Sequence, residues 1–360
     1  MAKRVLILTP YPYGTAPGPR SSIELWEHVL EPAGVTFEYA PFGGDRLHEV
    51  LYLRGHTFAK ARGMVGAYAQ RMRLMRRLRE FDAVLVYREA ALIGPAFFER
   101  WVARSGVPII YQLDDPLYIP YRSPSNGYLS YLKFFGKVGR IAALSRVTIV
   151  NSDQHRHYVA RFTDRIRQIP SVVDGERFRY VPREPDPDRP VRIGWSGSSS
   201  TAGNLATIAS VLRRIARRDD VELRFIGANG LDLPGVPFSS RPWLAESEVD
   251  DLRELDIGLL PLPDTAWTRR KFYLKLVQYM ALGIPAVCTP LGANPLVVEH
   301  GRTGFLADGD GEWTDALERL VEDAALRVEM GRLAAARAHE RYTLKANTER
   351  IVEAFRYAHG

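Results

Sequence analysis

The sequence of 360 residues predicts an α/β protein made of two Rossmann-like, doubly wound parallel-sheet domains in tandem. Three observations indicate this fold. Short segments rich in β-branched residues alternate with segments of helical periodicity along most of the chain. The alternation is interrupted by the proline-rich, charged stretch YVPREPDPDRP at residues 180–190, which is typical of an interdomain linker. The chain is also long enough for two separate hydrophobic cores.

The first predicted domain covers residues 1–180 and consists of repeated strand–helix units. Its expected strands are VLILTP, VTFEYA, AVLVYRE, PIIYQLDD and VTIVNS. Segments of helical spacing with glycine stops lie between them, such as SSIELWEHVLEPAG and GPAFFERWVARSG. Repeated units of this kind predict strands that run parallel.

The second predicted domain covers residues 190–342 and repeats the pattern. Its expected strands are VRIGWSGS, ELRFIGA, VPFSS, DIGLLPL, PAVCTP and TGFLADG. A long helical region rich in Ala, Arg and Glu follows, from about residue 317 to 359, with a break near residues 342–345. Each domain thus begins with a hydrophobic strand that runs into a turn of small residues.

Composition narrows the cellular setting. No apolar run approaches the ~20 residues that span a bilayer, and the apolar segment before Pro10 is too short for a signal peptide. The single cysteine, Cys288, lies in the apolar strand PAVCT, where we expect a buried, inert thiol. These features predict a cytoplasmic protein. The formal net charge of +7 favours an anionic partner, which could be a nucleotide sugar, a lipid headgroup or nucleic acid.

The most concentrated basic segment is KARGMVGAYAQRMRLMRRLR at residues 60–79. Met72, Met75 and Leu78 recur at helical spacing between arginines, which predicts an amphipathic basic helix. Such a helix either packs on the first sheet with a solvated arginine face or docks peripherally on the inner face of a membrane. We find no basic stripe interleaved with stacking aromatics and expect no nucleic-acid partner.

Two candidate ligand-binding segments follow strands of the first domain. The loop YPYGTAPGPRSS after the first strand contains Gly14, which permits close backbone approach, and Arg20, a permanent cation. The strand PIIYQLDD ends in Asp114 and Asp115, whose carboxylates could bind a metal, contact hydroxyl groups, or cap the DDPLY turn. Because the carboxyl ends of parallel strands form the ligand crevice of such sheets, both segments are candidates.

The second domain opens with IGWSGSSSTAG, a turn in which Ser196, Gly197 and Ser198 present an edge suited to anions. It is not a dinucleotide fingerprint, because G-x-G-x-x-G is absent. Gly227 ends the next strand. Trp243, in SRPWLAESEVDDL, is placed either to flank a nucleotide base or to pack in the structure.

The segment that organises this domain is residues 267–304. After the basic run of Arg269, Arg270 and Lys271 a helical pattern begins, and Lys271, Lys275 and Gln278 share one of its faces. Free N–H groups of a first helical turn attract phosphate, and two lysines would add full charges there. The alternative is a surface helix whose lysines are merely solvated.

The stretch KFYLKLVQYMALGIPAVCTPLGANPLVVEHGRTGFL resembles the donor-site signature of family 4 glycosyltransferases of the GT-B fold, in the branch K-x3-K-L-x-Q-Y-M-A-x-G-x-P. Many members of the wider family carry two glutamates spaced E-x7-E, where this sequence has Arg270 and Gln278. In the family the second glutamate usually holds the donor ribose, and a glutamine amide can still make that hydrogen bond. The first usually faces the sugar, a role that Arg270 cannot be assumed to fill.

The resemblance implies two domains facing across a cleft, with the final helix, about residues 343–360, packing back on the first domain. It implies a retaining transferase that moves a sugar from a nucleoside diphosphate sugar, a UDP- or GDP-sugar, to a hydroxyl of a glycan, a lipid-linked sugar or a small molecule. No metal or other cofactor is expected, because GT-B enzymes generally place leaving-group charge on lysine, arginine and helix ends.

Roles follow residue by residue from the same resemblance. The expected catalytic residues are Lys275, Lys271, Asp115, Asp114 and Arg20. The expected donor-binding residues are Gly14, Ser196, Gly197, Ser198, Gly227, Trp243, Arg270, Phe272, Tyr273, Leu274 and Gln278. Two alternatives remain open: a sugar-nucleotide epimerase or hydrolase on the same fold, and a non-catalytic basic protein that binds a membrane surface or nucleic acid.

Overall fold

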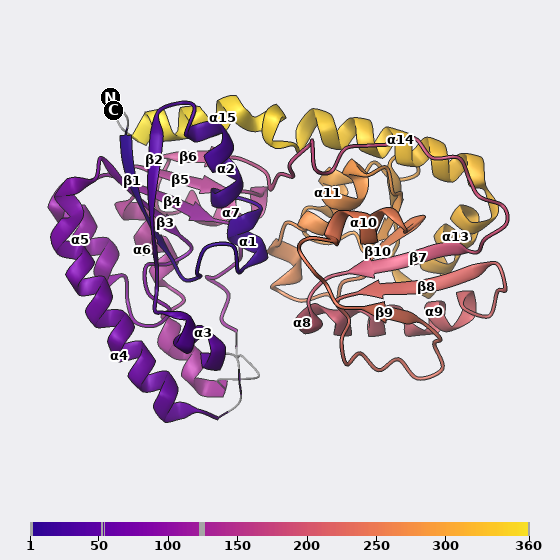
Figure 1. Ribbon diagram of the computed structural model, residues 1–360, viewed down its shortest axis with the longest axis horizontal. Coiled ribbons are helices and arrows are strands. Elements are labelled where there is room, and N and C mark those ends of the chain that lie inside the picture. Colours follow the sequence, from indigo (N-terminus) through magenta and orange to yellow (C-terminus); the bar gives the residue numbers. More distant parts are fainter. Residues whose placement is uncertain (1–2, 52, 54, 122–126, 359–360) are drawn as a thin grey trace. The chain divides into compact units, whose positions relative to one another are not determined.

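The computed structural model describes residues 3–51, 53, 55–121 and 127–358 (Figure 1). The chain divides into two compact units. Unit 1 comprises Met1–Ser171 and Asn347–Gly360, and unit 2 comprises Val172–Ala346. Each unit is built on its own six-stranded sheet in which all strand pairs are parallel. The predicted fold class, two doubly wound parallel-sheet domains, is therefore confirmed.

Unit 1 has the strand order β2-β1-β3-β4-β5-β6. Its strands are β1 (Lys3–Thr9), β2 (Val35–Pro41), β3 (Ala83–Tyr87), β4 (Ile109–Leu113), β5 (Val147–Val150) and β6 (Ile166–Gln168). Its helices are α1 (Pro17–Arg20), α2 (Ile23–Leu30), α3 (Asp45–Leu51), α4 (Thr57–Leu74), η1 (Met75–Glu80), α5 (Phe97–Ser105), η2 (Gly127–Lys133), α6 (Lys137–Leu144), α7 (Asp153–Val159) and most of α15 (Leu344–Ala358), where η marks a 3₁₀ helix.

The two faces of this sheet are covered by different helices (Figure 1). Successive strand side chains point to opposite faces, so Leu6 and Leu8 of β1 join the core under α4, η1, α5, α6 and α7. The other face is covered by α2 and α15, and Phe355 of α15 meets Phe37 of β2 with ring centroids 6.2 Å apart. Because helices cover both faces of the sheet, the connecting loops lie at the ends of its strands.

Unit 2 has the strand order β12-β11-β10-β7-β8-β9. Its strands are β7 (Val191–Ser196), β8 (Val221–Ile226), β9 (Ser239–Arg241), β10 (Ile257–Leu260), β11 (Ala286–Cys288) and β12 (Gly304–Leu306). Its helices are α8 (Ser199–Ala202), η3 (Gly203–Ile208), α9 (Ala209–Ile215), α10 (Glu248–Arg253), η4 (Thr268–Arg270), α11 (Leu274–Ala281), α12 (Asn294–Val297), α13 (Gly309–Glu322) and α14 (Ala324–Arg341).

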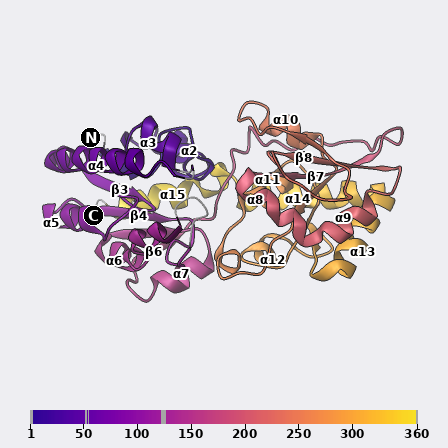
Figure 2. The ribbon, with the colours of Figure 1, turned by 90° about the horizontal axis from the view of Figure 1, so that it is seen from below.

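Two hydrophobic clusters form the core of unit 2, one on each face of its sheet. Residues of α10, α11 and α14 pack together on one face, and residues of η3, α9 and α13 pack on the other. Figure 2 shows α9 and α13 side by side, in agreement with their contacts. Cys288 of β11 is fully buried in the first cluster, as expected, and burial raises the pKa of its thiol.

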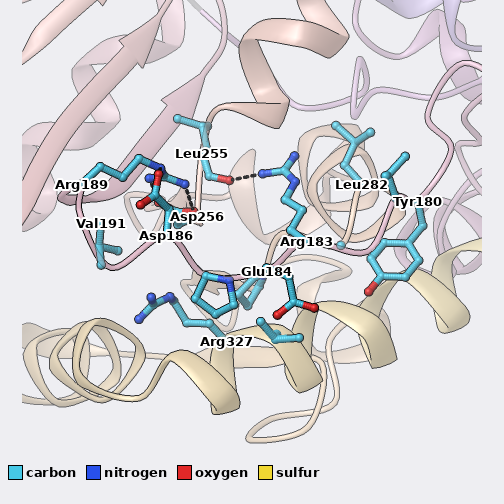
Figure 3. A pocket seen from close by; sticks show the side chains of 15 residues that line it. Tyr180, Arg183, Glu184, Asp186, Arg189, Val191, Leu255, Asp256, Leu282 and Arg327 are labelled. Atoms are coloured by element: carbon cyan, nitrogen blue, oxygen red, sulfur yellow. Dashed lines mark hydrogen bonds and ion pairs between the residues drawn. The ribbon is translucent and has the colours of Figure 1, made fainter.

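The proline-rich stretch at residues 180–190 is attached to unit 2 (Figure 3). The guanidinium of Arg189 donates to both carboxylate oxygens of Asp256, at 2.6 and 2.9 Å. Arg183 donates to the carbonyl of Leu255 at 3.1 Å. Arg183, Arg189 and Asp256 are among the residues that line a pocket at the carboxyl end of α11. Ion pairing therefore holds the stretch in place, although its prolines exclude regular secondary structure.

Candidate functional site

Helix α11 begins at Leu274, later than the sequence pattern predicts. Lys271 precedes it in an extended conformation, with φ −97° and ψ 145°. Its carbonyl accepts from the N–H of Ala293 at 3.3 Å instead of from the helix, and a Cβ on Gly292 would lie 2.3 Å from that carbonyl oxygen. The prediction of one helical face shared by Lys271, Lys275 and Gln278 is therefore wrong for Lys271 and holds for the other two.

Lys275 lies in the first turn of α11, half-buried against the end of β7. Its ammonium Nζ is 4.2 Å from the centroid of the Trp195 ring and 3.3 Å from Oγ1 of Thr201. Among the described residues no carboxylate forms an ion pair with it. Burial, and then the nearby charge of Lys271, lower the pKa of Lys275 to about 7. An anion beside this group would offset both effects.

The turn after β7 closes tightly on Lys275. A Cβ on Gly197 would lie 2.1 Å from the lysine Nζ and 2.6 Å from two ring carbons of Trp195, so a larger residue there would displace both side chains. The backbone N–H groups of Ser196 and Gly197 already donate to the Tyr279 hydroxyl and the Ile226 carbonyl, both at 2.9 Å. The expected anion-binding edge of free amides is therefore wrong for these two. The ammonium donates instead to the hydroxyl of Thr201, which lies in a cluster of three hydroxyls.

Those hydroxyls belong to the short helix α8 and the residue before it. Ser198 Oγ lies 2.8 Å from Ser200 Oγ and 3.5 Å from Thr201 Oγ1, and all three residues have exposed or half-buried side chains. Each hydroxyl can either donate or accept. Gly227, with φ +79°, brings the turn after β8 against this segment, because a Cβ there would lie 1.9 Å from the Gly197 carbonyl oxygen. Four predicted residues, Ser196, Gly197, Ser198 and Gly227, thus lie around Lys275.

Gln278 and Trp243 are joined by a residue that the sequence analysis missed, Glu248. Its Oε1 accepts from Gln278 Nε2 at 3.1 Å and from Trp243 Nε1 at 3.2 Å. Its Oε2 accepts from Arg177 at 3.1 Å. The sequence hides this role, since Glu248 begins α10 with Asp250 and Asp251 and resembles an ordinary acidic first turn.

The remaining predicted residues of unit 2 surround the start of α11. Arg270 donates to the Ala266 carbonyl at 2.8 Å. Phe272 is 6 % exposed and packs its ring against Tyr342 at 6.1 Å, so its side chain belongs to the core. Tyr273 is the N-cap of α11 and Leu274 is its first residue. Backbone N–H groups of a first helical turn lack the usual partner four residues earlier, and here that of Leu276 donates to the Tyr273 carbonyl at 3.1 Å.

In unit 1, Asp114 and Asp115 are bound by Arg88, which the sequence analysis also missed. Arg88 Nε lies 2.6 Å from Asp114 Oδ1, and Arg88 Nη2 lies 2.6 Å from Asp115 Oδ2. The Tyr87 hydroxyl donates to Asp114 Oδ2 at 2.5 Å. Burial alone would lower the pKa of Arg88, but the charges of Asp114 and Asp115 raise it well above its usual value.

Arg88 has φ +63°, an uncommon conformation for a residue other than glycine, directly after β3. Such backbone strain is often found at binding sites. The loop after β1 packs onto this cluster, because a Cβ on Gly18 would lie 2.4 Å from the Tyr87 hydroxyl. Arg20 ends α1 in the same loop. Gly14, with φ +72°, donates its N–H to Glu24 Oε1 at 3.1 Å. The predicted residues of unit 1 are thus brought to one edge of its sheet.

Over residues 3–51, 53, 55–121 and 127–358, no group of three or more His, Cys, Asp or Glu side chains is arranged to hold a metal ion. Within the same residues, no helix is long and apolar enough to cross a membrane.

The fold defines a class. Anabaena HepE in complex with UDP-glucose superimposes with a TM-score of 0.66 and 14 % identity, over 98 % of this chain and 99 % of that one. Sucrose-phosphate synthase from Thermosynechococcus elongatus gives 0.69 and 14 %, over 99 % and 98 %. The protein has the GT-B fold of these structures.

Sequence comparisons give a narrower likeness for part of the chain. Residues 190–323 match the family model of glycosyl transferases group 1, which confirms a resemblance to that group over these residues. The D-inositol 3-phosphate glycosyltransferase of Pseudarthrobacter chlorophenolicus is 35 % identical over 37 % of this chain and 34 % of its own. The enzyme of the same name from Arthrobacter sp. is 30 % identical over 48 % and 37 %. The matched stretch thus spans about a third of these relatives.

Proposed function

We propose that this protein is a glycosyltransferase that moves a sugar from a nucleoside diphosphate sugar to an acceptor hydroxyl. The observation that carries the proposal is the position of Lys275. Its ammonium is half-buried without an ion-paired carboxylate among the described residues, close to the charge of Lys271, and 3.3 Å from the hydroxyl of Thr201. An anionic group is what such a site lacks. The match of residues 190–323 to group 1 glycosyl transferases supports a diphosphate as that group.

Charge explains how this arrangement would promote transfer. When the bond from the sugar to the diphosphate breaks, negative charge grows on the departing phosphate oxygens. Lys275 and Lys271 would stabilise that growing charge more than the ground-state charge, and the first-turn amides of α11 would add to it. A bound diphosphate would also raise the pKa of Lys275 from about 7 and keep its ammonium protonated.

Gln278 would hold the ribose of the donor. Because its Nε2 donates to Glu248 at 3.1 Å, the amide is fixed and its Oε1 is left to accept from a ribose hydroxyl. Glu248 would therefore act as a positioning residue for Gln278. Trp243 donates to the same carboxylate and packs against the core cluster of α11, which supports packing as its role.

We propose a UDP-sugar as donor, because HepE has been crystallised with UDP-glucose on the same fold. The names of the D-inositol 3-phosphate glycosyltransferases suggest a polyol phosphate as the first acceptor to test, beside glycans and lipid-linked sugars. Retention of configuration and independence of metals stay part of the proposal. So does a cytoplasmic location.

The test begins with the donor. Titration of UDP, GDP, ADP and dTDP and their sugars into the protein, followed by calorimetry and thermal shift, identifies the nucleotide, since tight binding raises the unfolding temperature. Radiolabelled donor with and without acceptors then separates transfer from hydrolysis and epimerisation by product. Added chelator tests metal dependence, and the anomeric configuration of the product tests retention.

Lys275→Met tests the site, with the exposed Lys345→Met as matched control. We expect Lys275→Met to lower the transfer rate by at least ~100-fold with its folded structure retained, and Lys345→Met to behave as wild type. Wild-type transfer by Lys275→Met would remove the proposal. A protein that binds none of the nucleotides would remove it as well.

A further inference from the structure

The helix α4 turns an apolar stripe outward. Phe58, Val65 and Met72 recur every seven residues, which places them on one helical face, and they are 82 %, 71 % and 46 % exposed. An apolar hollow lies along the stripe, lined by Met64, Tyr68 and Ile93 among others. An isolated exposed apolar residue needs no explanation, but a continuous stripe of this kind marks a binding surface.

The inward face of the same helix packs Met64, Tyr68 and Leu74 against the core of unit 1 and also buries an arginine. Its buried residues are Ala67 and Arg71. The Arg71 guanidinium lies 5.8 Å from the Phe42 ring, and its Nη1 and Nη2 atoms have no hydrogen-bond partner in the described part of the chain. Because other side chains of α4 already meet the core, a helix that served only to cover the sheet would carry polar residues on its outer face. The outward stripe is therefore not explained by the core of unit 1.

Uncompensated positive charge borders the stripe. Arg62, at i+4 from Phe58, lies next to it on the helical wheel, Arg73 lies about 100° round the helix from Met72, and both are exposed. Neither forms an ion pair with any acidic residue that the structure describes. By contrast, the nearby Arg77 pairs with Glu38 at 2.8 Å.

A basic groove continues this surface between η1 and α5, which pack against each other. Arg76, Arg79 and Arg104 line the groove together with the aromatic rings of Phe97 and Trp101. Over residues 3–51, 53, 55–121 and 127–358, these three arginines also have no ion-pair partner. Phe97 is 45 % exposed. Arginine beside tryptophan at the border of an apolar stripe is the composition of proteins that lie in the headgroup region of a bilayer.

We propose that the α4 stripe and the η1–α5 groove form a surface that docks unit 1 onto a membrane rich in anionic phospholipid. Phe58, Val65 and Met72 enter the boundary between headgroups and acyl chains. Arg76, Arg79 and Arg104 bind lipid phosphates. The arginines decide between possible occupants, because their charges complement a sheet of phosphates. A second copy of this surface would bring the same positive charges together.

The proposal is independent of the transfer reaction and is tested without it. The full-length protein is sedimented with vesicles of phosphatidylcholine alone and with added phosphatidylglycerol, at low and high salt. We expect binding to anionic vesicles at least about tenfold tighter than to neutral ones, and weaker in high salt. Equal binding to both vesicles, or no binding to either, overturns the proposal.

Paired variants locate the contact. Phe58→Ser combined with Val65→Ser should weaken binding to anionic vesicles by about tenfold or more, since both lose membrane-inserted apolar area. Leu296→Ser, an exposed apolar residue of unit 2, is the control and should leave binding unchanged. Arg76→Gln with Arg104→Gln should remove most of the salt dependence, whereas Arg332→Gln should not. Unchanged binding in the Phe58 and Val65 variant overturns the proposal.

Two further outcomes name the competing occupants. Sedimentation velocity that shows a dimer, lost in the Phe58 and Val65 variant, would assign the stripe to a second copy. Tighter binding to duplex DNA than to anionic vesicles, with the same arginine dependence, would assign the groove to nucleic acid. Either result overturns membrane docking. Unfolding temperatures equal to that of wild type establish that each variant is folded.

Discussion

The side-chain amide of Gln278 and the carboxylate of Glu248 form a hydrogen bond of 3.1 Å between two different helices, α11 and α10. By its resemblance to the wider family pattern, residue 278 is expected to take the place of the second glutamate. The bond explains why glutamine suits this chain, because a glutamate there would face the carboxylate of Glu248. A carboxylate charge therefore lies beside residue 278, and it comes from another helix.

This relationship predicts that restoring the family residue is harmful. Gln278→Glu places two carboxylates in contact, so the pKa of one must rise above its unfolded value. A raised carboxyl pKa gives stability that is present at low pH and lost as pH rises through it. We expect the melting temperature of Gln278→Glu to match wild type near pH 5 and to fall below it near pH 8, with UDP-sugar affinity about tenfold weaker at pH 8.

The exchanged pair is the control. Glu248→Gln with Gln278→Glu keeps one amide and one carboxylate, and should recover most of the lost stability. If the double variant is no more stable than Gln278→Glu alone, the two side chains do not interact as the structure indicates.

Much of the fold was predictable because the pattern that identifies a hydrophobic strand lies within its own few residues. Every expected strand of unit 2 is present, including the three-residue β9 and β11. In unit 1 the strand β6, Ile166–Gln168, was missed, since its sequence IRQ carries one apolar residue and shows no alternation. This segment is a strand because it pairs with β5 at the edge of the sheet, and its own sequence gives no strand pattern.

The residues of the site were predictable only where they lie close together in the sequence. The motif around Lys275 and the small-residue turn at Gly197 are local in sequence and lie together in space. Arg88 and Glu248 were missed because their partners, Asp114 and Gln278, lie 26 and 30 residues away. The start of α11 was placed too early because the bond from Ala293 to the Lys271 carbonyl also joins distant segments. Pairings of this kind leave no periodic signal.

Lys275 makes stability depend on pH in a defined direction. Its pKa is lowered to about 7 in the folded protein, from 10.5 for an ordinary lysine. Between these values the unfolded chain binds more protons, so the contribution of Lys275 to stability rises with pH across that window. One proton is worth up to ~1.4 kcal/mol per pH unit. The free energy of unfolding from urea titrations at pH 7 and pH 9 should therefore rise more in wild type than in Lys275→Met.

Bound nucleotide provides the check on this prediction. Saturating UDP should raise the pKa of Lys275 and reduce the difference between wild type and Lys275→Met in pH dependence. An identical pH slope for the two free proteins would show that burial does not shift this lysine.

Arg88 holds two carboxylates, and its removal should be costly. Arg88→Ala leaves Asp114 and Asp115 adjacent with no counter-ion at Arg88, and breaking a buried pair in this way destabilises by about 3–5 kcal/mol. Urea unfolding near neutral pH measures the loss. Adding Asp114→Asn and Asp115→Asn to Arg88→Ala should restore part of it, because the repulsion is removed. A triple variant less stable than Arg88→Ala would contradict this account.

Substitutions at two glycines of one loop, Gly227 and Gly230, distinguish the cost of a left-handed backbone from the cost of a steric clash. Gly227 and Gly230 have nearly the same φ, +79° and +74°, and both favour glycine. Around Gly230 nothing lies within 4 Å of an added Cβ, whereas at Gly227 that atom would lie 1.9 Å from the Gly197 carbonyl oxygen. Gly230→Ala should therefore cost only the left-handed conformation, about 1–2 kcal/mol, and leave nucleotide affinity unchanged.

Gly227→Ala must also displace the turn that packs on Lys275. We expect a larger loss of stability in urea unfolding and a UDP affinity at least about tenfold weaker by calorimetry. Equal behaviour of the two variants would mean that the contact between the turns after β7 and β8 does not shape the site.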